Sequence, residues 1–114
     1  MSKRILKLSL ATALAFGAVA GAQAAEYVVG QKNKTFVDEA GNKVEHMSIK
    51  VGDTIRFLNE DPFFHNIFSL SDVKTFDLGS FPQGDSRTVT FDKAGKLDIE
   101  CAIHPQMHMV LEVQ

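Results

Sequence analysis

The stretch RTVTFDKAGKLDIEC, residues 87–101, alternates apolar and polar positions on both sides of a short turn. After the turn segment KAG, Leu97, Ile99 and Cys101 recur at every second position. Because successive side chains of a strand point to opposite faces, these three share one face, which we expect to be the core face. The stretch therefore predicts two neighbouring strands and places Cys101 inward at the end of the second.

The rest of the chain from residue 25 onward has the same character. No stretch there holds apolar residues at helical spacing over three turns. The expected strands are residues 26–31, 34–37, 44–51, 52–59, 65–70, 87–92, 96–101 and 109–113. Residues 75–86 contain Gly79, Pro82 and Gly84 and are interpreted as a loop. Several short strands at this spacing predict an all-β fold, either a β-sandwich or a small barrel.

The first 24 residues have the composition of a secretory signal peptide. A basic start precedes a short apolar run, residues 8–20, and the small-x-small triplet AQA follows at residues 22–24. We expect cleavage after Ala24, so that residues 1–24 are removed and residues 25–114 form a single domain in the periplasm. The apolar run is short and rich in small residues, which makes a membrane anchor the less favoured alternative.

Without the signal peptide the chain is acidic. Loss of three basic residues from the 12 Lys and Arg leaves nine against 14 Asp and Glu, a net charge of −5. An acidic domain without a basic run is a poor nucleic-acid binder, so we expect no nucleic-acid partner. A small exported domain often needs a crosslink, but one cysteine cannot form an internal disulfide. A bound metal ion would stabilise the fold and protect the thiolate.

That cysteine opens the segment CAIHPQMHM, residues 101–109. Pro105 cannot donate to a strand ladder, so we expect a loop between two strands. A cysteine at the strand end, His104 in the loop and a methionine at the loop's end can converge on one point. Thiolate, thioether and imidazole together select copper, and two histidines, one cysteine and a weak methionine describe a type 1, or blue, copper site. Zinc sites with one cysteine rarely include methionine.

The second histidine of such a site must come from elsewhere in the chain. His65 follows a turn that contains proline and begins an apolar run, so it is the favoured candidate. His46 shares its strand face with Ser48 and Lys50, which indicates a surface position. His108 is likewise a weaker candidate.

Two segments resemble the cupredoxins, the type 1 copper proteins that include plastocyanin, amicyanin and pseudoazurin. They are VGDTIRFLNEDPFFHN, residues 51–66, and VTFDKAGKLDIECAIHPQM, residues 89–107. The HPxM form of the second is similar to amicyanin and its methylamine-utilisation-type relatives. The resemblance implies a Greek-key β-sandwich of about seven to eight strands with one copper ion. It also implies a monomer that is not an enzyme and that carries single electrons between redox partner proteins.

The resemblance also implies the residues of the copper site. His65, Cys101 and His104 would surround the copper, with a methionine on the axis. Asn66 would support them, because its N–H is expected to donate to the Cys101 thiolate and its side chain to tie the two ligand loops together. Amicyanin-like spacing makes the axial ligand Met107, whereas plastocyanin-like spacing makes it a methionine two residues later.

The last strand favours the amicyanin-like spacing. In the resembling proteins this strand carries core residues four and six positions beyond the methionine ligand. From Met107 those positions are Leu111 and Val113, whereas from Met109 the second would lie beyond Gln114. We therefore expect Met107 to be the ligand and Met109 to be ordinary core packing.

Two alternative functions use the same residues. A thiol enzyme is disfavoured because Cys101 and His104 lack a nearby acid to orient the histidine. An exported copper carrier or storage protein without redox duty stays open, because the segment MHM at residues 107–109 could bind copper that is handed on. The predicted burial of the site favours electron transfer.

The resemblance further implies where a redox partner docks. One ring edge of His104 would reach solvent through an apolar patch, to which Phe63, Phe64, Pro105 and Gln106 are the expected contributors. Transient redox encounters use small interfaces, so such a patch is sufficient for docking. We expect one of the two phenylalanines to pack inward and the other to be exposed.

Overall fold

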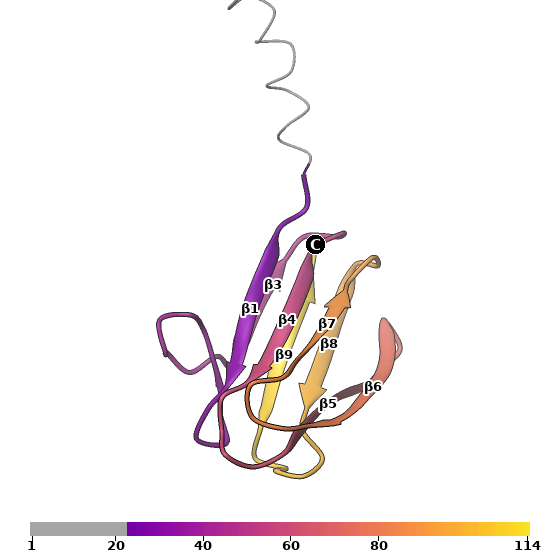
Figure 1. Ribbon diagram of the computed structural model, residues 1–114. Helices are drawn as coiled ribbons and strands as arrows, with labels where there is room; N and C mark the ends of the chain where they lie inside the picture. The colour runs from indigo at the N-terminus through magenta and orange to yellow at the C-terminus, as the bar shows by residue number, and fades with distance from the viewer. Residues whose placement is uncertain (1–22) are drawn as a thin grey trace, which may run out of the picture.

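The computed structural model describes residues 23–114, which form two packed β-sheets (Figure 1). The first sheet has the strand order β2-β1-β4-β7 and the second has the order β3-β9-β8-β5-β6. The strands are β1 (Glu26–Gln31), β2 (Phe36–Val37), β3 (His46–Ile49), β4 (Thr54–Asn59), β5 (His65–Ser71), β6 (Lys74–Phe81), β7 (Ser86–Thr90), β8 (Gly95–Glu100) and β9 (His108–Val113). The predicted all-β sandwich is confirmed.

The predicted signal peptide lies outside the described residues, apart from Gln23 and Ala24 at its end. Between residues 23 and 114, no helix has the length and apolar character that a membrane crossing requires.

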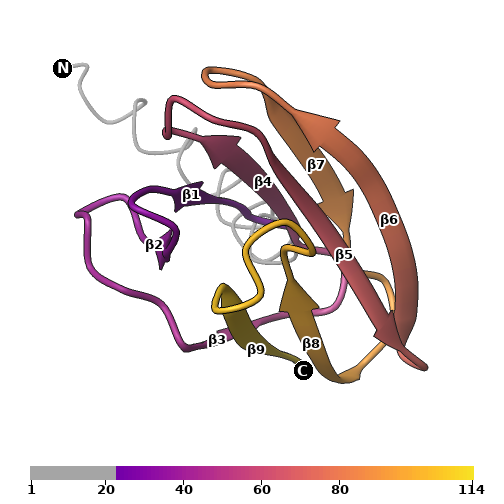
Figure 2. The same ribbon diagram turned by 90° about the horizontal axis from the view of Figure 1, so that it is seen from below.

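The strand pairing brings two distant segments to the same end of the sandwich. Strands β8 and β9 pair antiparallel, so the segment between them, residues 101–107, is a loop at that end. Strand β5 pairs antiparallel with β8 on its other side, with Phe68 opposite Glu100, so the start of β5 lies beside this loop. Figure 2 shows the loop between β8 and β9 next to β5, seen from this end.

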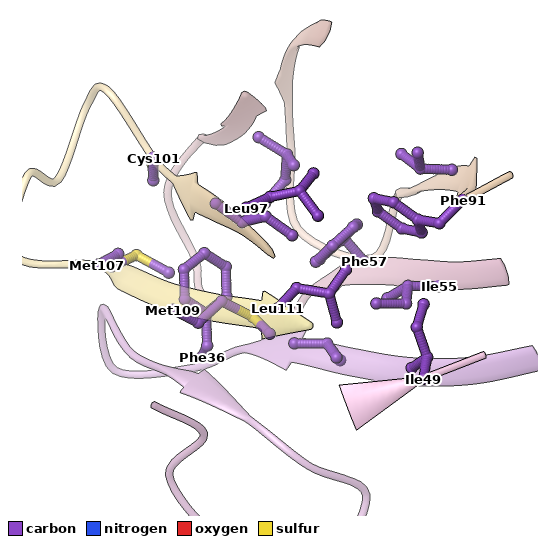
Figure 3. Packing of buried hydrophobic residues seen from close by; sticks show 14 of the residues in the cluster. Phe36, Ile49, Ile55, Phe57, Phe91, Leu97, Cys101, Met107, Met109 and Leu111 are labelled. Atoms are coloured by element: carbon purple, nitrogen blue, oxygen red, sulfur yellow. The ribbon is translucent and has the colours of Figure 1, made fainter. Parts of the chain in front are cut away.

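The core lies between the two sheets and follows the predicted alternation (Figure 3). Leu97, Ile99 and Cys101 are buried on one face of the second sheet, as the sequence predicts. Met109 and Leu111 of the neighbouring strand β9 are also buried in this cluster. Burying each side chain of this size contributes about 1.5 to 3 kcal/mol relative to leaving it in water.

The prediction of a loop over residues 75–86 is wrong for residues 75–81. This segment forms the edge strand β6 as far as Phe81, and only the residues after it turn toward β7. Gly79 does not end the strand, because the register between β5 and β6 shifts there in a β-bulge. Its φ of +74° is in the left-handed region that favours glycine, and its N–H donates to Asp77 Oδ1 at 3.0 Å.

Candidate metal centre

Three side chains from two distant segments of the chain meet at one end of the sandwich. His65 is the first residue of β5, Cys101 directly follows β8, and His104 lies in the loop between β8 and β9. The atoms His65 Nδ1, Cys101 Sγ and His104 Nδ1 all lie within 4.8 Å of one another. In the part of the chain that the structure describes, no other three His, Cys, Asp or Glu side chains meet at this spacing.

The triangle formed by these three atoms has the size of a single metal site. Cys101 Sγ lies 3.6 Å from His65 Nδ1 and 3.8 Å from His104 Nδ1, and the two nitrogens are 3.1 Å apart. Imidazole and thiolate bind a first-row metal ion at about 2.0 to 2.3 Å, so three ligands spread around one ion lie roughly 3.4 to 3.8 Å apart. The three atoms therefore fit one ion with little movement of the loops.

His65 is held by a buried carboxylate. The histidine is 0% exposed, and its Nε2 lies 2.7 Å from Asp61 Oδ2. Because Nδ1 faces Cys101, we assign the ring proton to Nε2, which then donates to Asp61. The Asp61 carboxylate also accepts the backbone N–H groups of Asn33 at 2.6 Å and Lys34 at 3.0 Å. Such a carboxylate orients a metal-binding histidine and increases its basicity.

The Asp61 carboxyl group is ionised at neutral pH. Burial alone raises its pKa, but hydrogen bonds from Lys34, His65 and Asn33 outweigh burial and leave the pKa below its usual value. Asn33 and Lys34 have φ angles of 55° and 56°, so both N–H groups turn toward the same carboxylate. Asp61 was not among the site residues predicted from the sequence. The signal in the sequence was its position four residues before His65, because metal-binding histidines commonly donate their second ring N–H to a carboxylate.

Asn59 shapes the loop that leads to His65. Its side chain is 0% exposed and donates to the carbonyl oxygens of Phe63 at 2.8 Å and Phe81 at 2.9 Å. Its Oδ1 accepts the N–H of Asp61 at 2.8 Å. A single buried amide therefore determines the path of the loop on the side of the first histidine.

Asn66 connects the two loops. Its N–H donates to Cys101 Sγ at 3.4 Å, and its Oδ1 accepts the N–H of Ala102 at 2.7 Å. Gln31 Nε2 donates to the Asn66 carbonyl at 3.3 Å from the other sheet. The segment after His65 is thus held against the segment after Cys101, which keeps the relative positions of these two side chains constant.

The loop between β8 and β9 closes on itself. The N–H of Met107 donates to the carbonyl of His104 at 2.9 Å, and the N–H of Cys101 donates to the carbonyl of Met107 at 3.4 Å. Met107 is 1% exposed. Figure 3 shows Met107 at the loop end near Cys101, whereas Met109, paired with Ile99, lies deeper in the core. The backbone of Met107 thus lies next to that of Cys101, whereas Met109 pairs with Ile99.

His104 is half-buried and contacts an aromatic ring. The ring of Phe63 lies 5.1 Å from that of His104 and 5.4 Å from that of His65, between centroids. Loss of hydration lowers the pKa of His104, electrostatic interaction with His65 and Lys34 lowers it further, and Asp61 opposes them. A lowered pKa favours neutral imidazole, which is the form that binds metal.

Apolar side chains that neighbour His65 and His104 in the chain are exposed, and Lys34 Nζ lies 5.5 Å from the centre of the Phe63 ring. Phe64 is 53% exposed and Ile103 is 45% exposed, and Pro105 and Gln106 are also exposed. Phe63, in contrast, is half-buried against the two histidines, so the expectation that only one of the pair is exposed is confirmed. We refer to Phe64, Ile103 and Pro105 as the apolar rim.

The other two histidines lie outside this centre. His46 is exposed on β3, as predicted. His108 is exposed at the start of β9, and its Nε2 lies 2.8 Å from Asp98 Oδ1. Neither belongs to the converging group.

A two-sheet β-sandwich with two histidines and a cysteine converging between its loops defines a small metal-binding β-protein. The family model described as copper binding proteins of the plastocyanin/azurin family matches residues 29–114. The methylamine utilization protein MauL of Methylorubrum extorquens is 30% identical over 111 residues, which cover 96% of this chain and 91% of MauL. The chain therefore belongs to the plastocyanin/azurin family of copper binding proteins, and its cofactor is copper.

Solved structures share its fold. A mutant of amicyanin in the Cu(I) form aligns with a TM-score of 0.68 at 22% identity, over 78% of this chain and 82% of that one. The Cu-containing nitrite reductase NirK of Thermus scotoductus SA-01 aligns with a TM-score of 0.67 at 24% identity, over 78% of this chain and 22% of the reductase. At these identities the likeness establishes the cupredoxin fold.

Proposed function

We propose that this protein is a periplasmic carrier of single electrons that binds one copper ion through His65, Cys101, His104 and Met107. The observation that carries the proposal is the convergence of two imidazole nitrogens and one thiolate sulfur within 4.8 Å. A bound copper ion supplies the Cu(I)/Cu(II) couple at such a set of ligands. Residues 25–114 form the mature domain, and the signal sequence before them supports the periplasmic location.

The chain's own part is to hold the ligands still. Asp61 orients His65, and Asn66 joins the two loops by two hydrogen bonds. Ligands held in this way keep one arrangement when the charge of the centre changes by one electron, so electron transfer requires little movement of the protein. The N–H of Asn66 also points at the Cys101 sulfur, which lowers electron density there and favours the reduced state.

The relatives support electron transfer over storage. MauL is named for methylamine utilization, and the amicyanin mutants were solved in states described as Cu(I), reduced and oxidized. Burial supports the same function, because His65, Cys101 and Met107 are each at most 1% exposed. A carrier that hands on its copper would need a more accessible group of ligands.

The visible absorption spectrum of the mature protein with Cu(II) tests this function. We expect an intense band from thiolate-to-copper charge transfer after one equivalent of copper is added to residues 25–114. A spectrum with only weak d–d bands would instead support the copper carrier.

The axial ligand can be tested by comparing two methionines of the same loop and strand. We expect Met107→Leu to change the reduction potential and the visible spectrum, because Met107 lies beside Cys101. Met109→Leu is the matched control, because Met109 packs opposite Ile99 and leucine of similar volume is tolerated there at less than about 1.5 kcal/mol. Electrochemistry of both variants that shows the larger shift for Met109→Leu would transfer the axial role to that residue.

The apolar rim is the proposed docking surface for redox partners. We expect Phe64→Glu to slow electron transfer to a partner from the same compartment by about tenfold, because a charge at the contact costs about 1.4 kcal/mol of binding or more. The reduction potential should change little, because Phe64 is exposed and forms no hydrogen bond with the ligands through its side chain.

The control for this prediction is Leu70→Glu, because Leu70 is 75% exposed on β5 but lies away from the loops. Stopped-flow rates should fall for Phe64→Glu and not for Leu70→Glu, while reaction with a small inorganic oxidant should be the same for both. Equal partner rates for the two variants would show that docking occurs elsewhere.

A further inference from the structure

Asp53 is a buried carboxylate at the end of the sandwich opposite the metal centre. It lies between β3 and β4 and is only 4% exposed. Its Oδ1 accepts the N–H of Ala25 at 2.8 Å, and its Oδ2 accepts the N–H of Lys50 at 2.9 Å. Figure 1 shows that β1 and β4 begin at this end, whereas the loop between β8 and β9 lies at the other.

Both backbone polar groups of Ala25 form hydrogen bonds with the domain. Its N–H donates to Asp53, and its carbonyl accepts the N–H of Thr54 at 3.0 Å. The parallel pairing of β1 with β4 starts at the next residue, with Glu26 opposite Thr54. Ala24, on the other side of the Ala24–Ala25 peptide bond, is exposed and outside any strand. Ala25, the residue that follows the predicted cleavage site, is therefore hydrogen-bonded to the domain directly before the first strand pair.

The charge on Asp53 has no cationic partner within the described residues. No Lys, Arg or His nitrogen of residues 23–114 forms a salt bridge with it, although the Lys50 side chain acts on it through space. The pKa of the Asp53 carboxyl is lowered, first by the N–H of Ala25 and then by that of Lys50, against the effect of burial. A largely buried carboxylate is thus ionised while its direct donors are two neutral amides.

We propose that Asp53 is a binding site for the α-ammonium group that removal of the signal peptide creates at Ala25. Hydrolysis breaks the C–N bond between Ala24 and Ala25. The hydroxyl of water goes to the carbonyl carbon of Ala24, which leaves as a carboxylate. The nitrogen of Ala25 takes up the protons and becomes an ammonium group. The neutral donor 2.8 Å from Asp53 Oδ1 is replaced by a cation, and charge-assisted hydrogen bonds of this kind are about twice as strong.

The proposal rests on cleavage after Ala24 and is independent of the assignment of the copper ligands. Its consequence is that the processed chain is more stable than a chain in which the nitrogen of Ala25 stays an amide. Removal of the signal peptide would therefore strengthen a contact between the start of β1 and Asp53 that the full chain already makes.

The stabilisation has a defined pH dependence. An α-amino group has an ordinary pKa of about 7.7 to 8.0, and a contacting carboxylate raises it in the folded chain. The gain is therefore fully present below the pKa of the unfolded chain and is lost as the pH rises through the folded pKa. The positive charge of Lys50, which also acts on Asp53, opposes this rise in the pKa of the ammonium group.

Two acidic side chains on the neighbouring elements have cationic partners of their own. Glu26 lies 3.8 Å from Arg56, and Asp92 lies 4.0 Å from Lys74. Asp53 is the carboxylate that accepts the N–H of Ala25, so its replacement should remove the pH dependence.

Two experiments test the proposal. In the first, the full chain is exported from a bacterial host, and the N-terminus of the copper-loaded product is sequenced. We expect it to begin at Ala25. A product that begins at Gln23, at Ala24 or at any residue after Ala25 would overturn the proposal for the natural protein.

The second experiment is a thermodynamic cycle on copper-loaded residues 25–114. The four proteins have a free or an Nα-acetylated Ala25, combined with Asp53 or Asp53→Asn. Acetylation restores a neutral amide at the same atom. At pH 6.5 we expect acetylation to increase the unfolding equilibrium constant about tenfold with Asp53, which corresponds to one pKa unit, and to change it little with Asp53→Asn. The effect should disappear above about pH 10, where the α-amine is neutral.

The pH titration of the Ala25 amine by NMR in the reduced protein keeps the test decisive even if Asp53→Asn fails to fold. We expect a midpoint above that of the same amine in the unfolded chain, and the visible copper band should be the same in all folded variants. An unshifted midpoint, or an acetylation effect of equal size with Asp53 and Asp53→Asn, would overturn the proposal.

Discussion

Replacing Cys101 with serine abolishes the intense visible band of the copper-loaded protein and leaves a folded β-protein. Cys101 contributes the thiolate of the converging group and is 1% exposed. A serine hydroxyl has nearly the same shape but stays protonated at neutral pH, so it cannot supply the charge-transfer band. The fold should persist because serine fills nearly the same space at the end of β8. Absorption spectra during Cu(II) titration and far-UV circular dichroism measure the two expectations.

The control for Cys101→Ser is His108→Ala. His108 lies in the same segment of the chain, but it is exposed and outside the converging group. We expect the His108 variant to keep the full band, which would separate the buried centre from copper bound at surface histidines. A Cys101→Ser protein that keeps its visible band would show that the thiolate is not a copper ligand.

Replacing Asp61 with alanine is expected to weaken copper binding about 10- to 100-fold, because the carboxylate that orients His65 is lost. Stability should fall as well. The Nε2–H of His65 is buried and would be left without an acceptor, which costs about 1 to 3 kcal/mol. The N–H groups of Asn33 and Lys34 lose the same acceptor. The segment that contains them, in which Lys34 lies over the Phe63 ring, is then no longer hydrogen-bonded to residue 61.

Copper affinity is measured by competition with a chelator of known affinity, and stability by urea unfolding. The matched control is Asp72→Ala, because Asp72 is exposed in the turn between β5 and β6. We expect that control to leave both quantities unchanged. If Asp61→Ala bound copper as tightly as the Asp72 variant, Asp61 would have only a structural role.

The fold class could be predicted from the sequence because its signal is local. Leu97, Ile99 and Cys101 alternate with polar residues, and the period of a strand is encoded in consecutive positions. The residues of the converging group could be named for a similar reason. Cys101 and His104 are separated by two residues around a proline, so their proximity depends on one short loop. Their role as copper ligands stays a prediction until the spectrum is measured.

Other features depend on contacts between distant segments, and local patterns do not encode these. Gly79 indicated a loop, yet it lies in a bulge whose existence depends on the register of β5 against β6. Phe63 and Phe64 are equivalent in sequence, but only the tertiary structure turns one toward the histidines and the other toward solvent.

The two buried carboxylates show the same limit most clearly. Asp61 receives N–H groups from Asn33 and Lys34, and Asp53 receives one from Ala25, in each case 27 or 28 positions away along the chain. The sequence by itself determined the strands other than β6, the fold class and the candidate ligands, because these follow from residue type and short spacing. Only the tertiary structure decided which carboxylates are buried and what they bind, because the pairing of the sheets brings their partners together.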